Sequence, residues 1–262
     1  MSSERFLKKC IRTAWNLLPK QRVQIARAVI HQADAAEQRS IGLVSLGAGL
    51  SVLKENGFAP GLVVDIGANR GNWSLDVARV FPSAAFILID ADPQNVPELQ
   101  AVCRSLPQSS FHSTLLGAET RGDMRFFQMG TGSSVMPEVT SADRNEISLA
   151  MTTLDALIGD QISSPALIKL DVQGYELEVL RGAPRCLKSA EVIILECAFL
   201  EYNEGAPLFA EVVDFMRERG FLVYDFCGAM RRSDGVLFQA DVIFAREDSP
   251  LRKSFRREAS GV

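Results

Sequence analysis

The sequence predicts an α/β fold with a doubly wound, mostly parallel, Rossmann-like sheet. From residue 60 onward, short apolar segments alternate with amphipathic helical segments, the pattern of strands joined by helices that cover both sheet faces. The last two strand-like segments are only about ten residues apart, too few for a helical crossover, so we expect an antiparallel C-terminal hairpin. A chain of 262 residues, 47% of them hydrophobic, suits one large domain with a short extension.

The expected strands and helices follow from the periodicity of the apolar residues. Buried, often β-branched runs predict strands at residues 62–66, 85–90, 110–116, 166–171, 192–196, 221–225 and 236–245. Helical spacing predicts helices at about 72–81, 94–105, 175–181 and 207–219. Residues 122–128 are expected to form a small antiparallel excursion, and Thr152 is expected to cap a helix in a capping box with Asp155.

The two ends of the chain differ from the centre. Helical spacing over 4–18 and about 21–36 predicts an N-terminal helical extension, residues 1–58, ahead of the α/β domain at 59–247. Its basic residues favour either a cap with a solvated basic face or a peripheral membrane helix that touches anionic lipid. Residues 248–262 are rich in basic residues and are expected to be a disordered tail.

Composition excludes several classes of function. The net charge of −4 argues against a nucleic-acid partner, which needs a basic face. The five cysteines are widely spaced without a C-x-x-C pair, so we expect no disulfide framework, no metal site and a reducing cytoplasm. No apolar run reaches membrane-spanning length, and basic residues interrupt any N-terminal signal.

A glycine-containing loop after the first strand predicts a nucleotide crevice. The loop holds Gly67, Ala68, Asn69 and Gly71 between a strand and a helix, where doubly wound folds bind nucleotides. A dinucleotide fingerprint requires glycines where this chain has Asn69 and Asn72, so the fingerprint fails.

Two acids predict which cofactor binds instead. Asp65 precedes the loop, and Asp90, followed by Ala91, ends the second strand, where a carboxylate binds ribose hydroxyls. A carboxylate before the loop repels pyrophosphate and suits a ligand that carries an ammonium and a sulfonium. The sequence therefore predicts S-adenosylmethionine as the cofactor.

With these residues in place, the chain resembles the FkbM family of methyltransferases from about residue 60 to 246. The resemblance rests on five segments in order: Asp65–Gly71, Asp90–Pro93, Gly132–Ser134, Thr152–Asp155 and Lys169–Gly174. It implies a class I methyltransferase fold and O-methylation of hydroxyls, commonly on glycans or secondary metabolites, and it adds Ser133 and Ser134 to the cofactor site. The family usually has Glu where this chain has Gln173, and often Glu in place of Asp90.

Carboxylates are the candidates for catalysis. A hydroxyl is a poor nucleophile, so a general base is expected to help by about 10²–10⁴-fold. His31 and His112 are expected to be structural or solvated. Asp171 ends the fourth strand and is the preferred base, with Glu196 at the end of the fifth strand and Lys169 beside Asp171 on the same strand face.

The sequence leaves three functions to be separated. The first is O-methylation of a small-molecule or glycan acceptor, a polysaccharide, glycolipid or secondary metabolite. The second is an NAD-dependent oxidoreductase on a similar sheet, which the failed fingerprint disfavours. The third is a cofactor-binding module without catalysis, in keeping with Gln173 in place of a glutamate. The oligomeric state is not indicated.

Overall fold

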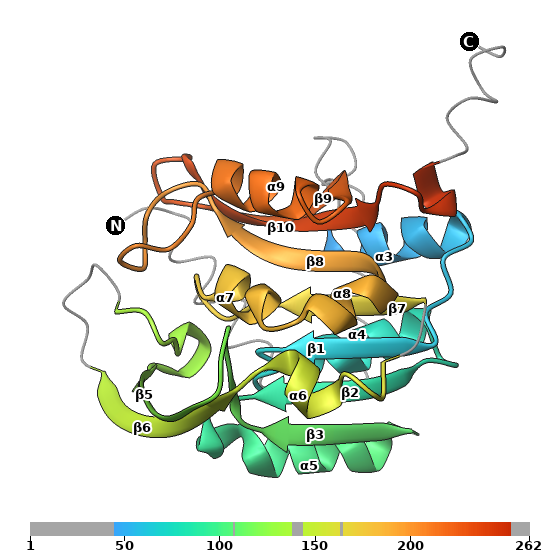
Figure 1. Ribbon diagram of the computed structural model, residues 1–262. Coiled ribbons are helices and arrows are strands. Elements are labelled where there is room, and N and C mark those ends of the chain that lie inside the picture. The colour runs from blue at the N-terminus through green and yellow to red at the C-terminus, as the bar shows by residue number, and fades with distance from the viewer. Residues whose placement is uncertain (1–44, 107, 138–143, 163–164, 253–262) are drawn as a thin grey trace, which may run out of the picture. The chain divides into compact units, whose positions relative to one another are not determined.

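The computed structural model describes residues 45–106, 108–137, 144–162 and 165–252 (Figure 1). The chain divides into two units, Met1–Ser45 and Leu46–Val262, and all helices and strands described below belong to the second. The helices predicted over 4–18 and 21–36, and the tail from residue 253, lie outside the described residues.

A seven-stranded sheet forms the centre, in the order β3-β2-β1-β7-β8-β10-β9 (Figure 1). All strands run parallel except β10, which is antiparallel to both of its neighbours. The strands are β1 (Leu62–Ile66), β2 (Ala85–Asp90), β3 (Ser109–Ser113), β7 (Ala166–Leu170), β8 (Ala190–Ala198), β9 (Phe221–Arg231) and β10 (Leu237–Arg246). The predicted doubly wound sheet with an antiparallel C-terminal hairpin is confirmed. In this hairpin β10 lies between β8 and β9, so β9 is the edge strand of the sheet.

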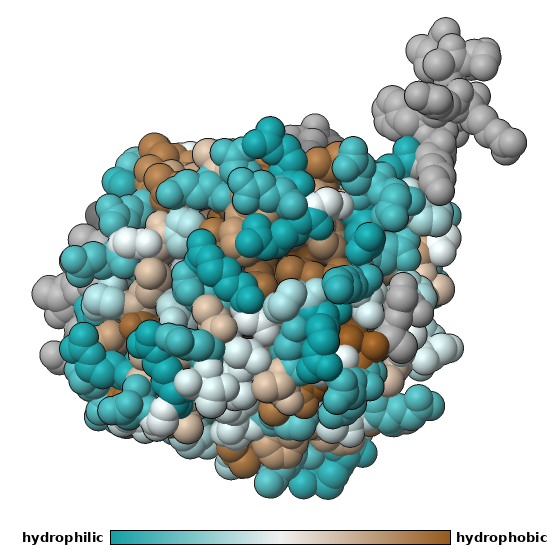
Figure 2. All heavy atoms as spheres, viewed as in Figure 1, coloured by the Kyte–Doolittle hydropathy of each residue, from teal (hydrophilic) through white to brown (hydrophobic). Residues whose placement is uncertain are grey.

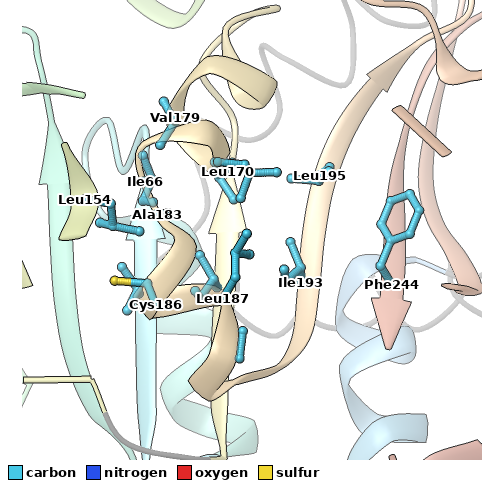
Figure 3. Close-up of a cluster of buried hydrophobic side chains, with 14 of the residues drawn as sticks. Ile66, Leu154, Leu170, Val179, Ala183, Cys186, Leu187, Ile193, Leu195 and Phe244 are labelled. Carbon is cyan, nitrogen blue, oxygen red and sulfur yellow. The ribbon is translucent and has the colours of Figure 1, made fainter. Parts of the chain in front are cut away.

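Helices cover both faces of this sheet, which is why β1 and β7 are buried along their whole length and are apolar except at Asp65 and Lys169. One face packs against α3 (Leu46–Glu55), α4 (Asn72–Val80) and α5 (Val96–Ser105). The other packs against α6 (Leu154–Ile158), α7 (Glu176–Arg181), α8 (Pro184–Ser189) and α9 (Phe209–Arg217). Figure 3 shows the second core, where Leu170 and Leu195 point from the sheet toward Val179 of α7 and Leu187 of α8.

Helix α3 belongs to the same compact unit as the sheet. We expected the domain to begin at residue 59, whereas the unit begins at Leu46. Leu50 and Leu53 are three positions apart on one helical face and are both fully buried against the core that contains Ile243. At the other end, Leu251 is buried in the short 3-10 helix η3 (Pro250–Arg252), so the first residues of the expected tail are packed.

A second, three-stranded sheet stands beside the carboxyl ends of the main strands (Figure 1). Its order is β4 (Leu115–Leu116), β6 (Asn145–Thr152) and β5 (Arg121–Gln128). The single strand expected at 110–116 is wrong, because the chain leaves the main sheet at Thr114. Strand β6 was not predicted, since half of its residues are exposed and half are polar. The cap of α6 is Thr153 rather than Thr152, and its Oγ1 accepts the N–H of Ala156 at 3.1 Å.

The strand order creates a crevice at one edge of the sheet. From β1 the chain continues to β2 and β3 on one side, and it later returns to place β7 on the other side of β1. In such sheets ligands bind outside the carboxyl ends of the strands at this switch point. On the face seen in Figure 2, hydrophilic side chains predominate, with small hydrophobic areas between them.

Candidate functional site

A cavity of about 460 Å³ opens at the carboxyl ends of β1, β2, β7 and β8. Its walls include the residues that follow these strands, the loop 129–135, and parts of β9 and β10. This volume lies in the range of small-molecule and cofactor sites. The cavity therefore occupies the crevice that the strand order predicts.

The loop after β1 packs tightly against the loop after β7. Gly67 has a φ of 76°, and a Cβ added there would lie 1.9 Å from the backbone oxygen of Asp171. Gly71 has a φ of 73° and precedes the first turn of α4, close to Val102 and Leu88. Both positions need glycine, because a positive φ and a close neighbour exclude a side chain.

Asp90 ties the loop after β1 to the loop after β2. Its Oδ2 accepts the backbone N–H of Asn69 at 2.6 Å, and its Oδ1 accepts the N–H of Asp92 at 2.8 Å and Nδ2 of Asn95 at 3.0 Å. Burial raises the pKa of Asp90, and these three hydrogen bonds oppose the rise. The carboxylate thus shapes the cavity wall and still has one lone pair on Oδ2 for a ligand hydroxyl.

The loop that carries Ser133 and Ser134 closes over this wall. Asp92 accepts Nε2 of Gln128 at 2.7 Å and lies 3.5 Å from Oγ of Ser133. Ser134 is buried, and its Oγ donates to the backbone oxygen of Gln173 at 3.0 Å. The serines therefore join the small sheet to the loops after β2 and β7.

A buried ion-pair group lies beneath the loops after β1 and β7. Nζ of Lys169 is 3.1 Å from Oδ2 of Asp171 and 3.9 Å from Oδ1 of Asp65, which faces Lys169 across neighbouring strands. Oγ of Ser74 donates to Oδ2 of Asp65 at 2.7 Å. Burial alone would lower the pKa of Lys169, but Asp171 and Asp65 outweigh it and hold that pKa above its ordinary value. Lys169 therefore stays charged.

Gln173 bridges two carboxyl groups on the cavity wall. Its Nε2 donates to Oδ1 of Asp171 at 2.9 Å and to Oε2 of Glu196 at 2.8 Å. Nε2 of Gln239 donates to the other oxygen of Glu196. The backbone of Gln173 has a φ of 54°, and its carbonyl accepts Nδ2 of Asn203 at 2.7 Å. An uncommon backbone conformation held from several sides is typical of a functional position.

Several carboxyl groups at this edge of the main sheet have raised pKa values. Burial, assisted by the nearby charges of Asp171 and Glu176, raises the pKa of Glu196 to about 9. Burial also raises the pKa of Glu176 to about 7 and that of Asp241, which faces Glu196 from β10, to about 6. At neutral pH Glu196 is therefore protonated.

The structure brings most of the sequence-predicted site residues to one cavity. The predicted residues that line it are Gly67, Asn69, Asp90, Ala91, Ser133, Ser134, Asp171 and Glu196. The predicted residues that do not line it are Asp65, Ala68, Gly71 and Lys169. Asp65 was expected to face the ligand but is fully buried against Ser74 and Lys169, so it acts through its neighbours.

Some residues of the site were not found from the sequence. Asp92 belongs to a quoted motif, but its contacts with Gln128 and Ser133 join segments far apart in the chain. Gln239 lies in the C-terminal hairpin, where nothing in the sequence marks it as a residue of the site. Asp241 had one available signal, an acid within an apolar strand, which is the same signal that singled out Lys169.

The charge of the cavity wall fits a cationic cofactor. Asp90, Asp92 and Asp171 line the cavity beside the protonated Glu196, and none of its lining residues is Lys, Arg or His. A wall of this charge disfavours the pyrophosphate of a dinucleotide and favours an ammonium or sulfonium. Asp90 and the backbone of Gly67 and Asn69 are the groups on this wall that could hold such a cofactor.

Neither a metal-binding cluster nor a membrane-spanning helix is found among the residues that the structure describes. In the part of the chain that the structure describes, no group of three or more His, Cys, Asp or Glu residues is arranged to hold a metal ion. Among the same residues no helix is both long enough and apolar enough to cross a membrane.

Similar solved structures share low sequence identity with this chain. Methyltransferase FkbM from Methylobacillus flagellatus is 17% identical, with a TM-score of 0.47 over 71% of this chain and 44% of that one, so this chain spans less than half of that protein. Magnesium protoporphyrin IX methyltransferase from Synechocystis, solved with S-adenosylmethionine, is 14% identical (TM-score 0.43, 74% of both chains). An O-methyltransferase family protein from Burkholderia thailandensis is 11% identical (TM-score 0.44, 87% of this chain and 63% of that one).

The comparison of the chain with protein-family profiles identifies its family. No curated protein gives a significant match to the chain. The family profile of the Methyltransferase FkbM domain matches residues 65–223, more than half of the 262 residues, and this range includes every predicted cofactor-binding and catalytic residue. The chain belongs to the FkbM methyltransferase family.

Proposed function

We propose that this methyltransferase transfers a methyl group to a hydroxyl of a carbohydrate or a related metabolite. The observation that carries the proposal is Asp171. Its side chain is 32% exposed on the cavity wall, while Lys169 behind it is only 6% exposed. A fixed carboxylate that faces the cavity is the group needed to accept a proton from a hydroxyl.

Asp171 is a better base than its neighbour Glu196. Nζ of Lys169 contacts Oδ2 of Asp171 at 3.1 Å and holds that oxygen in place. Gln173 contacts Oδ1 and fixes the plane of the carboxylate, and each oxygen keeps a lone pair for the acceptor. Glu196, with a pKa of about 9, already carries a proton at neutral pH and cannot accept another.

The other end of the cavity suits a sugar or similar ring. Tyr202 and Phe238 form an edge-to-face pair with ring centroids 5.3 Å apart, and both line the cavity. Gln173 and Gln239 lie beside them and present amide groups. Aromatic faces pack against the C–H groups of a sugar ring, and a few polar groups then select among its hydroxyls.

The cofactor supplies an activated methyl group on a sulfonium. Asp171 supplies the proton acceptor, and the loops after β1, β2 and β7 fix the distance between the two reactants. Because the methyl group is already activated, positioning and exclusion of water account for most of the help the protein gives. We propose Asp90, Gly67, Asn69, Ser133 and Ser134 as the residues that form the cofactor's walls.

The test is transfer of labelled methyl from S-adenosylmethionine to a panel of sugars, glycosides and phenolic metabolites. We expect label in a product that survives mild alkali, since an ether resists alkali and a methyl ester does not. Cofactor binding without transfer to any acceptor would instead support a binding module. Protection of the protein against heat by NAD and not by S-adenosylmethionine would support the oxidoreductase alternative.

A further inference from the structure

The charge of the cavity bears on which acceptors enter it. Asp171 and Glu196 stand at the acceptor end, and Asp90 and Asp92 stand at the opposite end. All the lining residues are described by the structure, and they include no lysine, arginine or histidine. An acceptor with a carboxylate or phosphate near its reacting hydroxyl therefore meets Asp171 beside the protonated Glu196, and no lining residue offers it a cation.

The nearest buried cation is already paired. Nζ of Lys169 lies between Asp171 and Asp65 and 5.5 Å from the ring centroid of Trp73. Its side chain is 6% exposed, and it does not line the cavity. An acceptor anion that took Lys169 as its partner would leave two buried carboxylates without theirs, which is costly.

The two arginines at the exposed end of the β9–β10 hairpin are also engaged. Arg231 and Arg232 follow Met230, a cavity-lining residue, at the exposed end of the β9–β10 hairpin. Nη2 of Arg232 is 2.8 Å from Oδ2 of Asp234, and Nη1 of Arg231 donates to the backbone oxygen of Gly235 at 3.0 Å. Neither arginine lines the cavity.

The other groups that line the acceptor end suit an uncharged ring. Tyr202, Phe238 and Met230 offer apolar surface, and Met230 is 54% exposed at the mouth. The Nε2 groups of Gln173 and Gln239 already donate to Asp171 and Glu196, so what these amides offer an acceptor is chiefly their carbonyl oxygens. Carbonyl oxygens accept hydrogen bonds from hydroxyls and repel anions.

From this arrangement we infer that the acceptor is a sugar ring without an anionic group, and that the enzyme rejects uronic acids and sugar phosphates. The inference rests on the proposed function and narrows it. It assigns to the acidic wall a second role besides holding a cationic cofactor, namely selection of the acceptor by charge.

The test compares acceptors that differ only in charge. Methyl glucosides, galactosides and mannosides are each assayed beside the corresponding uronides and the uncharged methyl esters of those uronides. We expect kcat/KM to be at least about tenfold higher for the glycoside and the ester than for the uronide. The ratio should shrink as NaCl is raised, because salt screens charges at a cavity open to solvent.

A variant that adds a positive charge checks that the effect is electrostatic. Met230→Lys places a cation at the cavity mouth and is expected to raise the relative kcat/KM for uronides severalfold. Met230→Gln is the matched control and should leave the ratio unchanged. Met230 is exposed, so neither change is expected to unfold the protein.

The outcomes separate this inference from the proposed function. Transfer to uronides as efficient as transfer to the matching glycosides would overturn the inference and leave O-methylation of sugars intact. Transfer to none of these sugars, in a protein that binds S-adenosylmethionine, would overturn both. Equal ratios for Met230→Lys and Met230→Gln would also contradict selection by charge.

Discussion

The closest approach between two loops of the site is at Gly67. A Cβ at this position would overlap the backbone oxygen of Asp171, so the absence of a side chain sets the distance between the loop after β1 and the loop after β7. In the proposed function, these two loops hold the cofactor and the base. The geometry of the reaction thus depends on a residue that takes no part in the chemistry.

We predict that Gly67→Ala destabilises the protein by more than about 1 kcal/mol, since alanine disfavours a positive φ and clashes here. Cofactor affinity should fall at least about tenfold. Urea denaturation and calorimetry measure the two effects. Gly61→Ala is the control, because nothing lies within 4 Å of an added Cβ there. Equal stability and affinity of the two variants would show that the close approach is unimportant.

Gln173 gives a second prediction at this scale. Gln173→Met keeps the length of the side chain but removes the donor that Asp171 and Glu196 share. We expect kcat to fall at least about tenfold with little change in the KM of the cofactor. The low-pH limb of kcat should move to higher pH, because an amide donor stabilises an ionised carboxylate. The exposed Gln161→Met should behave like the wild type, and an unchanged pH profile in Gln173→Met would refute the role.

At the scale of elements, helix α3 shows how a segment outside the nucleotide crevice supports the sheet. Leu53 is fully buried between α3 and the strands, and α3 packs on β9 at the edge of the sheet. Edge strands are the least supported part of a sheet, so a helix across this one limits its exposure.

Leu53→Ala is expected to lower the free energy of unfolding by about 2–5 kcal/mol, through lost apolar contact and the cavity left behind. Glu55→Ala, on the exposed side of the same helix, should change it by less than about 0.5 kcal/mol. Urea unfolding monitored by circular dichroism compares them. Similar values for both variants would mean that α3 does not support the domain.

The sequence predicted best those elements whose own residues indicate whether the element is buried or exposed. Strands β1 and β7 are apolar except at Asp65 and Lys169, and both are buried throughout in the structure. Strand β6 could not be predicted in the same way, because half of its residues are exposed and its partners β4 and β5 lie elsewhere in the chain. Thr114 likewise gives no local sign that the chain changes sheets.

The residues of the site also divide into those that the sequence predicted and those that it could not predict. The residues at the strand ends, Asp90, Asp171 and Glu196, were predicted because parallel strands bring their carboxyl ends to one edge. The ion pair of Lys169 with Asp171 follows from a shared strand face. The direction of Asp65, inward to Ser74, could not be predicted, because it depends on which partners fill the space beneath the loop.

For the molecule as a whole, the raised pKa values of Glu176, Glu196 and Asp241 link stability to pH. In the folded protein these groups hold their protons up to about pH 7, 9 and 6, whereas the unfolded chain loses them near pH 4. Between these limits the folded state binds more protons than the unfolded state. Stability therefore falls as pH rises, and the part due to Glu196 is lost up to about pH 9.

We predict that the Tm decreases between pH 5 and pH 9 and that Glu196→Gln flattens the portion above about pH 7. The neutral amide cannot ionise, so the variant no longer loses stability when Glu196 would lose its proton. Glu247→Gln, at an exposed position, should follow the wild-type curve. Differential scanning calorimetry in matched buffers provides the curves. A slope in Glu196→Gln that equals the wild-type slope would contradict the raised pKa.

The central claim is that Asp171 removes the proton from an acceptor hydroxyl beside the bound cofactor. The most direct measurement is kcat for Asp171→Asn across pH 5 to 9, with cofactor affinity determined by calorimetry on the same sample. We predict that kcat falls by about 10²-fold or more, that its low-pH limb disappears, and that the cofactor still binds. Normal turnover by Asp171→Asn, with Glu196→Gln inactive instead, would contradict the claim and place the base on β8.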